Sequence, residues 1–144
     1  MANLEISVGN SLYYEYQAPG ARGQTFVFVN ALTGNTGMWE VEAIGPALRA
    51  AGYGTLVYNF RGQAESAFTP DADLGPVTIV EDLKRIVDHV APPRPILAGL
   101  SIGGLFAAQA YLKGARAEGL VLINTLRKPS LRLEWINSAM VRMA

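Results

Sequence analysis

Residues 95–112 read PILAGLSIGGLFAAQAYL and carry no charged side chain. Residues 95–100 form a short apolar run bounded by Pro95, which is typical of a strand buried on both faces. Residues 102–112 have the length of a helix, and the glycines around Ser101 predict a tight turn between the two elements. The stretch is nearly as long as a membrane span, but its glycines, its proline and its polar residues favour strand, turn and helix. We therefore expect no membrane span.

The rest of the chain repeats the alternation of strand and helix. Gly9 and Asn10 separate two short strands and predict a hairpin. Pro46 is expected to break or restart one of the helices, and Thr78 with Glu81 is expected to form a capping box at the start of another. This order predicts an α/β fold, a three-layer sandwich with a mostly parallel sheet and helices on both faces. The predicted strands cover residues 5–8, 12–17, 25–30, 54–59, 95–100 and 119–123, and the predicted helices cover 38–50, 78–90, 102–112 and 129–143.

Composition and charge limit the classes of function. Half of the 144 residues are hydrophobic and 17% are charged, which indicates a single globular domain. Twelve basic and twelve acidic residues cancel, whereas a nucleic-acid-binding protein normally has a basic excess, so we expect no nucleic-acid partner. The chain has no cysteine, which excludes disulfides and thiol catalysis. The N-terminus does not resemble a signal peptide, so we expect a cytoplasmic protein, and we expect neither a cofactor nor a metal site.

The turn itself carries a chemical motif. Residues 99–103, Gly-Leu-Ser-Ile-Gly, match G-x-S-x-G between a predicted strand and a predicted helix. In that context the serine occupies a sharp turn with its hydroxyl exposed above the sheet, and glycines on both sides let the neighbouring backbone pack closely. The amide of Ile102 then points to the same place from the helix N-terminus, where it can stabilise an oxyanion. Ser101 is thus the candidate nucleophile, and a plain turn with a solvated serine is the alternative.

From these residues outward the chain resembles the N-terminal portion of the α/β-hydrolase family, over about residues 4 to 128. The segment 30–34, Asn-Ala-Leu-Thr-Gly, stands where that family often has His-Gly, and the resemblance implies that the Leu32 amide is the second oxyanion donor. Residues 59–66 read NFRGQAES where the family often has Asp-x-Arg-Gly-x-Gly-x-Ser. We expect Arg61 to form a structural ion pair or a loop anchor. The loop ALTG, residues 31–34, also resembles that of homoserine acyltransferases, which keeps acyl transfer as an alternative activity.

The chain does not contain a usable histidine for such a nucleophile. The resemblance implies an acid and then a histidine after two further strands, but the one histidine of the chain is His89, before Ser101. His89 lies near the end of a helix that runs antiparallel to the strands. A strand of about 5 residues then separates it from Ser101 by roughly 16 Å, whereas a base must come within about 3 Å. Lys128 is a conceivable Ser–Lys partner that otherwise belongs to a solvated loop, and Glu65 and Asp71 could line the site or lie on the surface.

We therefore predict two segments, residues 1–128 as the N-terminal part of a hydrolase core and residues 129–144 as the start of a cap or lid helix. The predicted activity is esterase- or lipase-like hydrolysis of a small ester or acyl compound, with an apolar pocket around Leu32 and Phe68. The acid and the histidine are expected from a missing C-terminal part or a second polypeptide; a truncated or nicked chain, or a homo-oligomer that buries the exposed sheet edge, is an alternative. A non-catalytic binding or scaffold protein is the other functional alternative.

Overall fold

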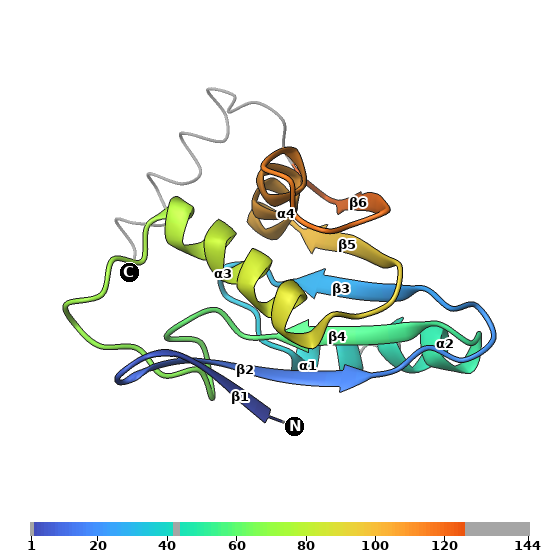
Figure 1. Cartoon of the computed structure of the whole chain (residues 1–144), viewed down its shortest axis with the longest axis horizontal. Helices are drawn as coiled ribbons and strands as arrows, with labels where there is room; N and C mark the ends of the chain where they lie inside the picture. The colour runs from blue at the N-terminus through green and yellow to red at the C-terminus, as the bar shows by residue number, and fades with distance from the viewer. Residues whose placement is uncertain (1, 42–43, 126–144) are drawn as a thin grey trace.

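The computed structural model describes residues 2–41 and 44–125 (Figure 1). The predicted helix over residues 129–143, the predicted segment boundary at residue 128 and Lys128 lie outside the described residues.

The strands form one mixed sheet in the order β1-β2-β4-β3-β5-β6. The antiparallel hairpin β1–β2 pairs through β2 with β4, and β4, β3, β5 and β6 are mutually parallel. The predicted hairpin and the four predicted parallel strands are confirmed, and three of these four, β3, β4 and β5, are mostly buried. Their bounds are β1 Ala2–Ser7, β2 Asn10–Gln17, β3 Thr25–Val29, β4 Gly54–Tyr58, β5 Pro95–Leu100 and β6 Gly119–Ile123.

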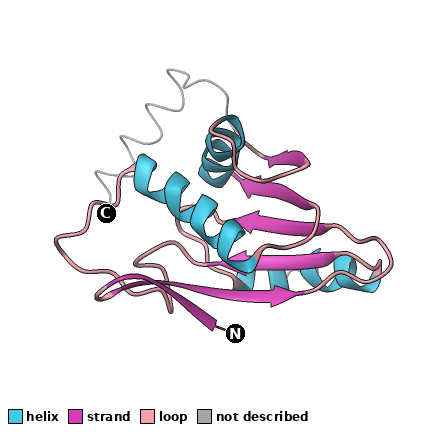
Figure 2. Cartoon of the chain, in the orientation of Figure 1, coloured by secondary structure: helices cyan, strands magenta, loops and turns pink. Residues whose placement is uncertain are grey.

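Among the described residues, four helices cover the two faces of the sheet and make three layers (Figures 1 and 2). The helices α3 (Pro76–Val90) and α4 (Ile102–Leu112) pack side by side on one face. The short helices α1 (Gly37–Glu40) and α2 (Ile44–Ala50) lie on the other face. The three-layer α/β architecture expected from the sequence is confirmed.

One predicted detail of the helices is wrong and another is confirmed. Helix α3 begins at Pro76, two residues before the predicted capping box, and its N-cap Gly75 makes no side-chain capping bond. The reason is that Pro76 has no N–H to satisfy and has a helical φ built in. The segment 38–50 contains two helices, and Pro46 lies in the first turn of α2, where the helix restarts as expected. Proline is tolerated there because the first-turn amides need no intrahelical partner.

The core follows the alternation of side chains along the strands. Val27, Val29 and Leu56 face α3 and α4 and are fully buried with residues of those helices. Phe28 points to the opposite face, where it stacks on Trp39 with 4.4 Å between ring centroids. Because β3 and β4 are covered on both faces at these positions, the centre of the sheet is a rigid platform for the loops that leave its carboxyl edge.

Candidate active site

Ser101 occupies a strained turn between β5 and α4. Its backbone has φ 55° and ψ −124°, a conformation that glycine adopts freely and other residues rarely adopt. The turn is held by hydrogen bonds: the Ser101 N–H donates to the Ile123 carbonyl at 2.9 Å. The Ser101 carbonyl accepts from the Gly104 N–H at 3.0 Å and from the Thr125 hydroxyl at 3.1 Å. The residue itself is exposed at the carboxyl edge of the sheet.

The glycines around Ser101 are required by close backbone approaches. A Cβ at Gly99 would overlap the backbone of Gly103, and a Cβ at Gly103 would overlap the carbonyl groups of Val29 and Asn30. A Cβ at Gly104 would overlap the side chain of Thr125. The first turn of α4 therefore rests directly on the end of β3, which brings the loop after β3 next to Ser101.

The loop after β3 is built around the buried side chain of Asn30. Its Oδ1 accepts from the Trp39 indole N–H at 2.7 Å, and its Nδ2 donates to the Tyr58 carbonyl at 2.8 Å. Asn59, at the end of β4, accepts from the Thr36 N–H at 2.9 Å. These bonds satisfy buried polar groups at the ends of two adjacent strands and fix the path of the loop between them.

The predicted oxyanion donors are the backbone N–H groups of Leu32 and Ile102. A turn from Ala31 to Gly34 is closed by the Gly34 N–H on the Ala31 carbonyl at 3.0 Å, which leaves Leu32 at its second position. Ile102 is the first residue of α4. Within residues 2–41 and 44–125, neither the Leu32 nor the Ile102 N–H is the donor of a hydrogen bond. Because β3 and β5 are neighbours with Val29 level with Gly99, both loops leave the same edge of the sheet.

Charged residues of the segment after β4 form structural contacts with neighbouring elements. Arg61 and Asp82 form a bidentate pair at 2.7 Å for both contacts, with only 9% and 5% of their side chains exposed. The prediction of an ion pair for Arg61 is confirmed. Glu65 accepts a 2.8 Å hydrogen bond from Asn59. Burial, and to a lesser degree the charge of Asp82, raises the pKa of Tyr58 well above its ordinary value.

His89 belongs to a different part of the molecule. Its Nε2 lies 3.2 Å from the Tyr14 hydroxyl, at the last turn of α3. Tyr14 is on β2, three strand positions from β5 in the sheet, which corresponds to roughly 14 Å across the strands. The structure thus does not bring His89 and Ser101 together.

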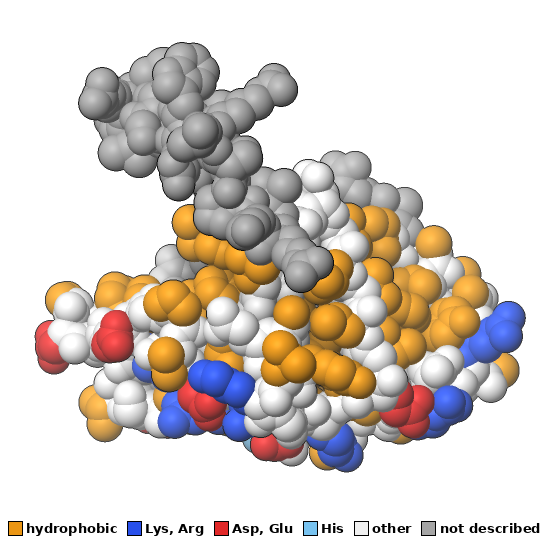
Figure 3. Space-filling view, turned by 90° about the horizontal axis from the view of Figure 1, so that it is seen from above, with side chains coloured by type: hydrophobic (Ala, Val, Ile, Leu, Met, Phe, Trp, Pro, Cys, Tyr) orange, Lys and Arg blue, Asp and Glu red, His pale blue; other side chains and the backbone are white. Residues whose placement is uncertain are grey.

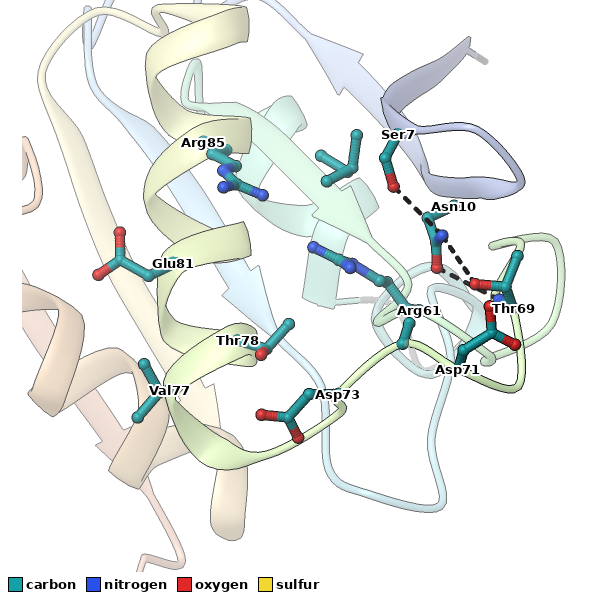
Figure 4. A pocket seen from close by; sticks show the side chains of 12 residues that line it. Ser7, Asn10, Arg61, Thr69, Asp71, Asp73, Val77, Thr78, Glu81 and Arg85 are labelled. Atoms are coloured by element: carbon teal, nitrogen blue, oxygen red, sulfur yellow. Dashed lines mark hydrogen bonds between the residues drawn. The ribbon is translucent and has the colours of Figure 1, made fainter.

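In the described part of the chain, two of the cavities adjoin the loops that follow β3 and β4. The larger, of about 530 Å³, lies between the β1–β2 turn, the loop after β4 and α3, and includes Arg61, Asp71 and Thr78 in its wall (Figure 4). Asn10 crosses one side of this cavity and donates to Ser7 at 3.2 Å and to Thr69 at 3.0 Å (Figure 4). The smaller of the two, of about 310 Å³, has Leu32, Phe68 and other apolar side chains in its wall together with Arg61 and Gln63. Ser101 lines neither cavity.

The α4 and β6 side of the molecule is apolar. Viewed from above, hydrophobic side chains gather over this side and charged ones lie towards its rim (Figure 3). Val121 and Leu122 point to opposite faces of β6, yet 39% and 50% of them is exposed. In the part of the chain that the structure describes, no strand pairs with the outer edge of β6. The described residues also hold no group of three or more His, Cys, Asp or Glu suited to a metal ion, and no helix among them is long and apolar enough to cross a membrane.

Sequence reasoning missed three residues that shape this edge of the sheet. Asn30 and Thr125 are discussed above, and the side chain of Gln63 bonds to the loop that carries Leu32. The role of Asn30 could have been predicted, because a polar residue directly after a buried strand needs hydrogen-bond partners at the sheet edge. The role of Gln63 could not be predicted from local sequence, since its partners in the loop after β3 are about thirty residues away in the chain.

Comparison with known proteins places this geometry in a family. The family model described as the alpha/beta hydrolase fold matches residues 24–142. A Variovorax paradoxus (strain S110) protein named "Putative carbamate hydrolase RutD" is 34% identical over 120 residues, which are 83% of this chain and 44% of that protein.

Solved structures agree on the fold. A carboxylesterase study of Nitrososphaera gargenis gives a structure with a TM-score of 0.82 at 21% identity, covering 99% of this chain and 52% of the other. A hydrolase from Pseudomonas aeruginosa PA01 has a TM-score of 0.76 at 28% identity, covering 99% and 53%. The chain spans about half the length of the relatives that it matches. With its six-stranded, mostly parallel sheet, it belongs to the alpha/beta hydrolase fold family.

Proposed function

We propose that this chain contributes the nucleophile to a serine hydrolase that acts on a small ester or related acyl compound. The observation that carries the proposal is the backbone of Ser101, an exposed residue other than glycine held at φ 55° and ψ −124°. Such strain costs of order 1–3 kcal/mol and persists only where the surroundings impose it. Here the turn is held by hydrogen bonds to Ile123, Gly104 and Thr125, and the neighbouring glycines, Gly99, Gly103 and Gly104, have no room for a Cβ.

The chemistry follows from the groups around this turn. The Ser101 hydroxyl attacks the acyl carbon, and the oxyanion that forms accepts hydrogen bonds from the Ile102 and Leu32 N–H groups. The hydroxyl proton passes to a base and then to the leaving alcohol or amine, and water releases the acyl group from the serine by the reverse sequence. Carbamates carry the same acyl carbon, so the name of the Variovorax relative fits this substrate class.

The base and its orienting acid come from outside this chain in this proposal. The chain holds one histidine, and its contact with Tyr14 keeps it away from Ser101. The remainder of a family-sized fold, either as a longer protein or as a second polypeptide, would pair with the outer edge of β6 and cover Val121 and Leu122. The apolar faces there support this arrangement.

Labelling with a fluorophosphonate tests the nucleophile. The purified sample is first analysed by intact mass, so that any second polypeptide with a histidine is identified and retained. We expect the probe to modify Ser101, found by peptide mapping, and the Ser101→Ala variant to remain unlabelled while it folds normally. Ser7→Ala, another exposed serine, is the matched control and should label like the wild type.

An unlabelled Ser101 in a sample that contains every polypeptide contradicts the hydrolase proposal. It would favour a binding or scaffold protein, which the position of His89 already makes the second candidate. A labelled Ser101 leaves hydrolysis and acyl transfer to be separated by adding alcohol or amine acceptors. Transfer to these acceptors in competition with water would assign the ALTG loop, residues 31–34, to a transferase.

A further inference from the structure

The side chain of Gln63 ties together the loops that follow β3 and β4. Its Oε1 accepts from the Phe60 N–H at 3.0 Å, which anchors the amide to its own loop. Its Nε2 donates to the Leu32 carbonyl at 2.8 Å and to the Ala31 carbonyl at 3.3 Å. Oε1 also accepts from the Asn30 Nδ2 at 3.4 Å, directly after β3. Both ends of the side-chain amide are therefore in use, and the side chain links the two loops.

These bonds act on both peptide groups that flank Leu32. All peptide bonds described are trans, so the carbonyl and the N–H of each peptide group point in opposite directions. A hydrogen bond that fixes the Ala31 carbonyl thereby fixes the direction of the Leu32 N–H. The Gly34 N–H holds the same carbonyl from within the turn, while the bond to the Leu32 carbonyl comes from Gln63.

The backbone segment that carries Gln63 is itself held by hydrogen bonds. The Gln63 N–H donates to the Phe60 carbonyl at 2.9 Å, and the Ser66 N–H donates to the Gln63 carbonyl at 2.9 Å. Ser66 in turn bonds through its hydroxyl to the Asn59 carbonyl at 2.8 Å. The buried pair of Arg61 with Asp82 fastens the same loop to α3. Because its own segment is fixed, the Gln63 side chain can fix the orientation of the peptide groups in the loop after β3.

We propose that Gln63 is a positioning residue that holds the Leu32 N–H in the direction needed to bind the oxyanion. The inference rests on the proposed function, because it takes the Leu32 amide as an oxyanion donor. Without the bonds from Gln63, the peptide group between Ala31 and Leu32 is held on one side only, by the turn. The N–H can then rotate away from Ser101, and the transition state loses a donor while the bound substrate loses little.

Two variants of Gln63 test the proposal. Gln63→Glu keeps the acceptor for the Phe60 N–H but replaces the donor by a carboxylate against two carbonyl groups. Gln63→Met is similar in length and uncharged, and it serves if the carboxylate prevents folding. Gln17→Glu is the matched control, because Gln17 is exposed at the far end of β2 and its side chain makes no hydrogen bond to any described residue.

The first readout is the orientation of amides in the full chain, measured by residual dipolar couplings. We expect the Leu32 N–H coupling to change in both Gln63 variants, the Ile102 coupling to stay the same, and Gln17→Glu to match the wild type. The second readout is catalysis in the sample that labels at Ser101. Loss of one oxyanion donor costs about 100- to 1000-fold in kcat, so partial misorientation should cost at least about 10-fold, with KM nearly unchanged.

Each result decides the matter. An unchanged Leu32 coupling in both variants overturns the proposal, and so does a changed coupling with an unchanged kcat. An equal loss in kcat and gain in KM would mean that Gln63 shapes the substrate site and does not orient the amide. If the wild type itself is not labelled at Ser101, the proposed function fails first, and Gln63 is then only a structural tie between two loops.

Discussion

Ser101 has a backbone conformation that favours glycine over any residue with a side chain. Replacement by glycine relieves the strain at φ 55°, whereas replacement by alanine keeps it. We predict that Ser101→Gly is more stable to urea than Ser101→Ala by about 1 kcal/mol, since strain relief of order 1–3 kcal/mol is partly offset by the greater freedom of glycine in the unfolded chain. Equal midpoints of unfolding for the two variants would show that the turn is not strained.

The contribution of Arg61 and Asp82 to stability depends on their pairing, because both charges are largely removed from water. We predict that Arg61→Met lowers the free energy of unfolding by about 3 kcal/mol, since it leaves the Asp82 carboxylate buried with Arg85 as its remaining partner at 3.5 Å. The double variant Arg61→Met, Asp82→Leu should recover much of this loss. Denaturant unfolding of the two variants measures the difference, and a double variant less stable than Arg61→Met contradicts the prediction.

Individual side chains show where sequence reasoning stops. An ion pair for Arg61 was predictable from its chemistry, but its partner was not, because Asp82 lies 21 residues further along on a helix. Gln63 and its contacts with residues 31 and 32 depend on the register between β3 and β4, which no local pattern records. The identity of the candidate nucleophile was predictable, since its motif is contiguous in the chain.

At the level of elements, the sequence is more informative. The bounds of β5, α4 and β6 agree with the predicted ranges, because each is an apolar run that a glycine, a proline or the turn at Ser101 delimits. The start of α3 was predicted two residues late, since a capping-box pattern competed with Pro76 at the first helical position. Local pattern thus locates an element well, and competing end signals blur its first turn.

Two strand glycines allow the packing of α4 on the sheet to be tested. A Cβ at Gly99 of β5 would meet the backbone of Gly103 and Gly104, which cannot move aside without displacing α4. A Cβ at Gly119 of β6 would make ordinary contacts of 3.8 and 4.0 Å with the Ile96 side chain. We predict a loss of about 3 kcal/mol for Gly99→Ala and no loss for Gly119→Ala, by thermal or urea unfolding. Equal effects would mean that the close approach of α4 is not needed.

For the whole molecule, the exposed side of β6 is the decisive feature. Val121 and Leu122 lie on opposite faces of the strand, so neither face of the sheet is fully covered there. We predict that the isolated chain self-associates at micromolar to millimolar concentrations through this side, because an uncovered apolar edge gains by pairing with another. Sedimentation at a series of concentrations should show mass above that of one chain.

Charge placed on this side should reverse the association. Leu122→Lys puts an ammonium group on the apolar face, and we expect it to return the chain to the mass of a monomer. Val8→Lys is the matched control, because Val8 is 89% exposed in the turn between β1 and β2, at the opposite end of the strand order. A wild-type chain that stays monomeric, or a Val8→Lys variant that dissociates equally well, would show that β6 is not the associating edge. If a polypeptide with two further strands instead occupies that edge, its addition should remove self-association and confer labelling of Ser101 together, since the same strands would bring the histidine.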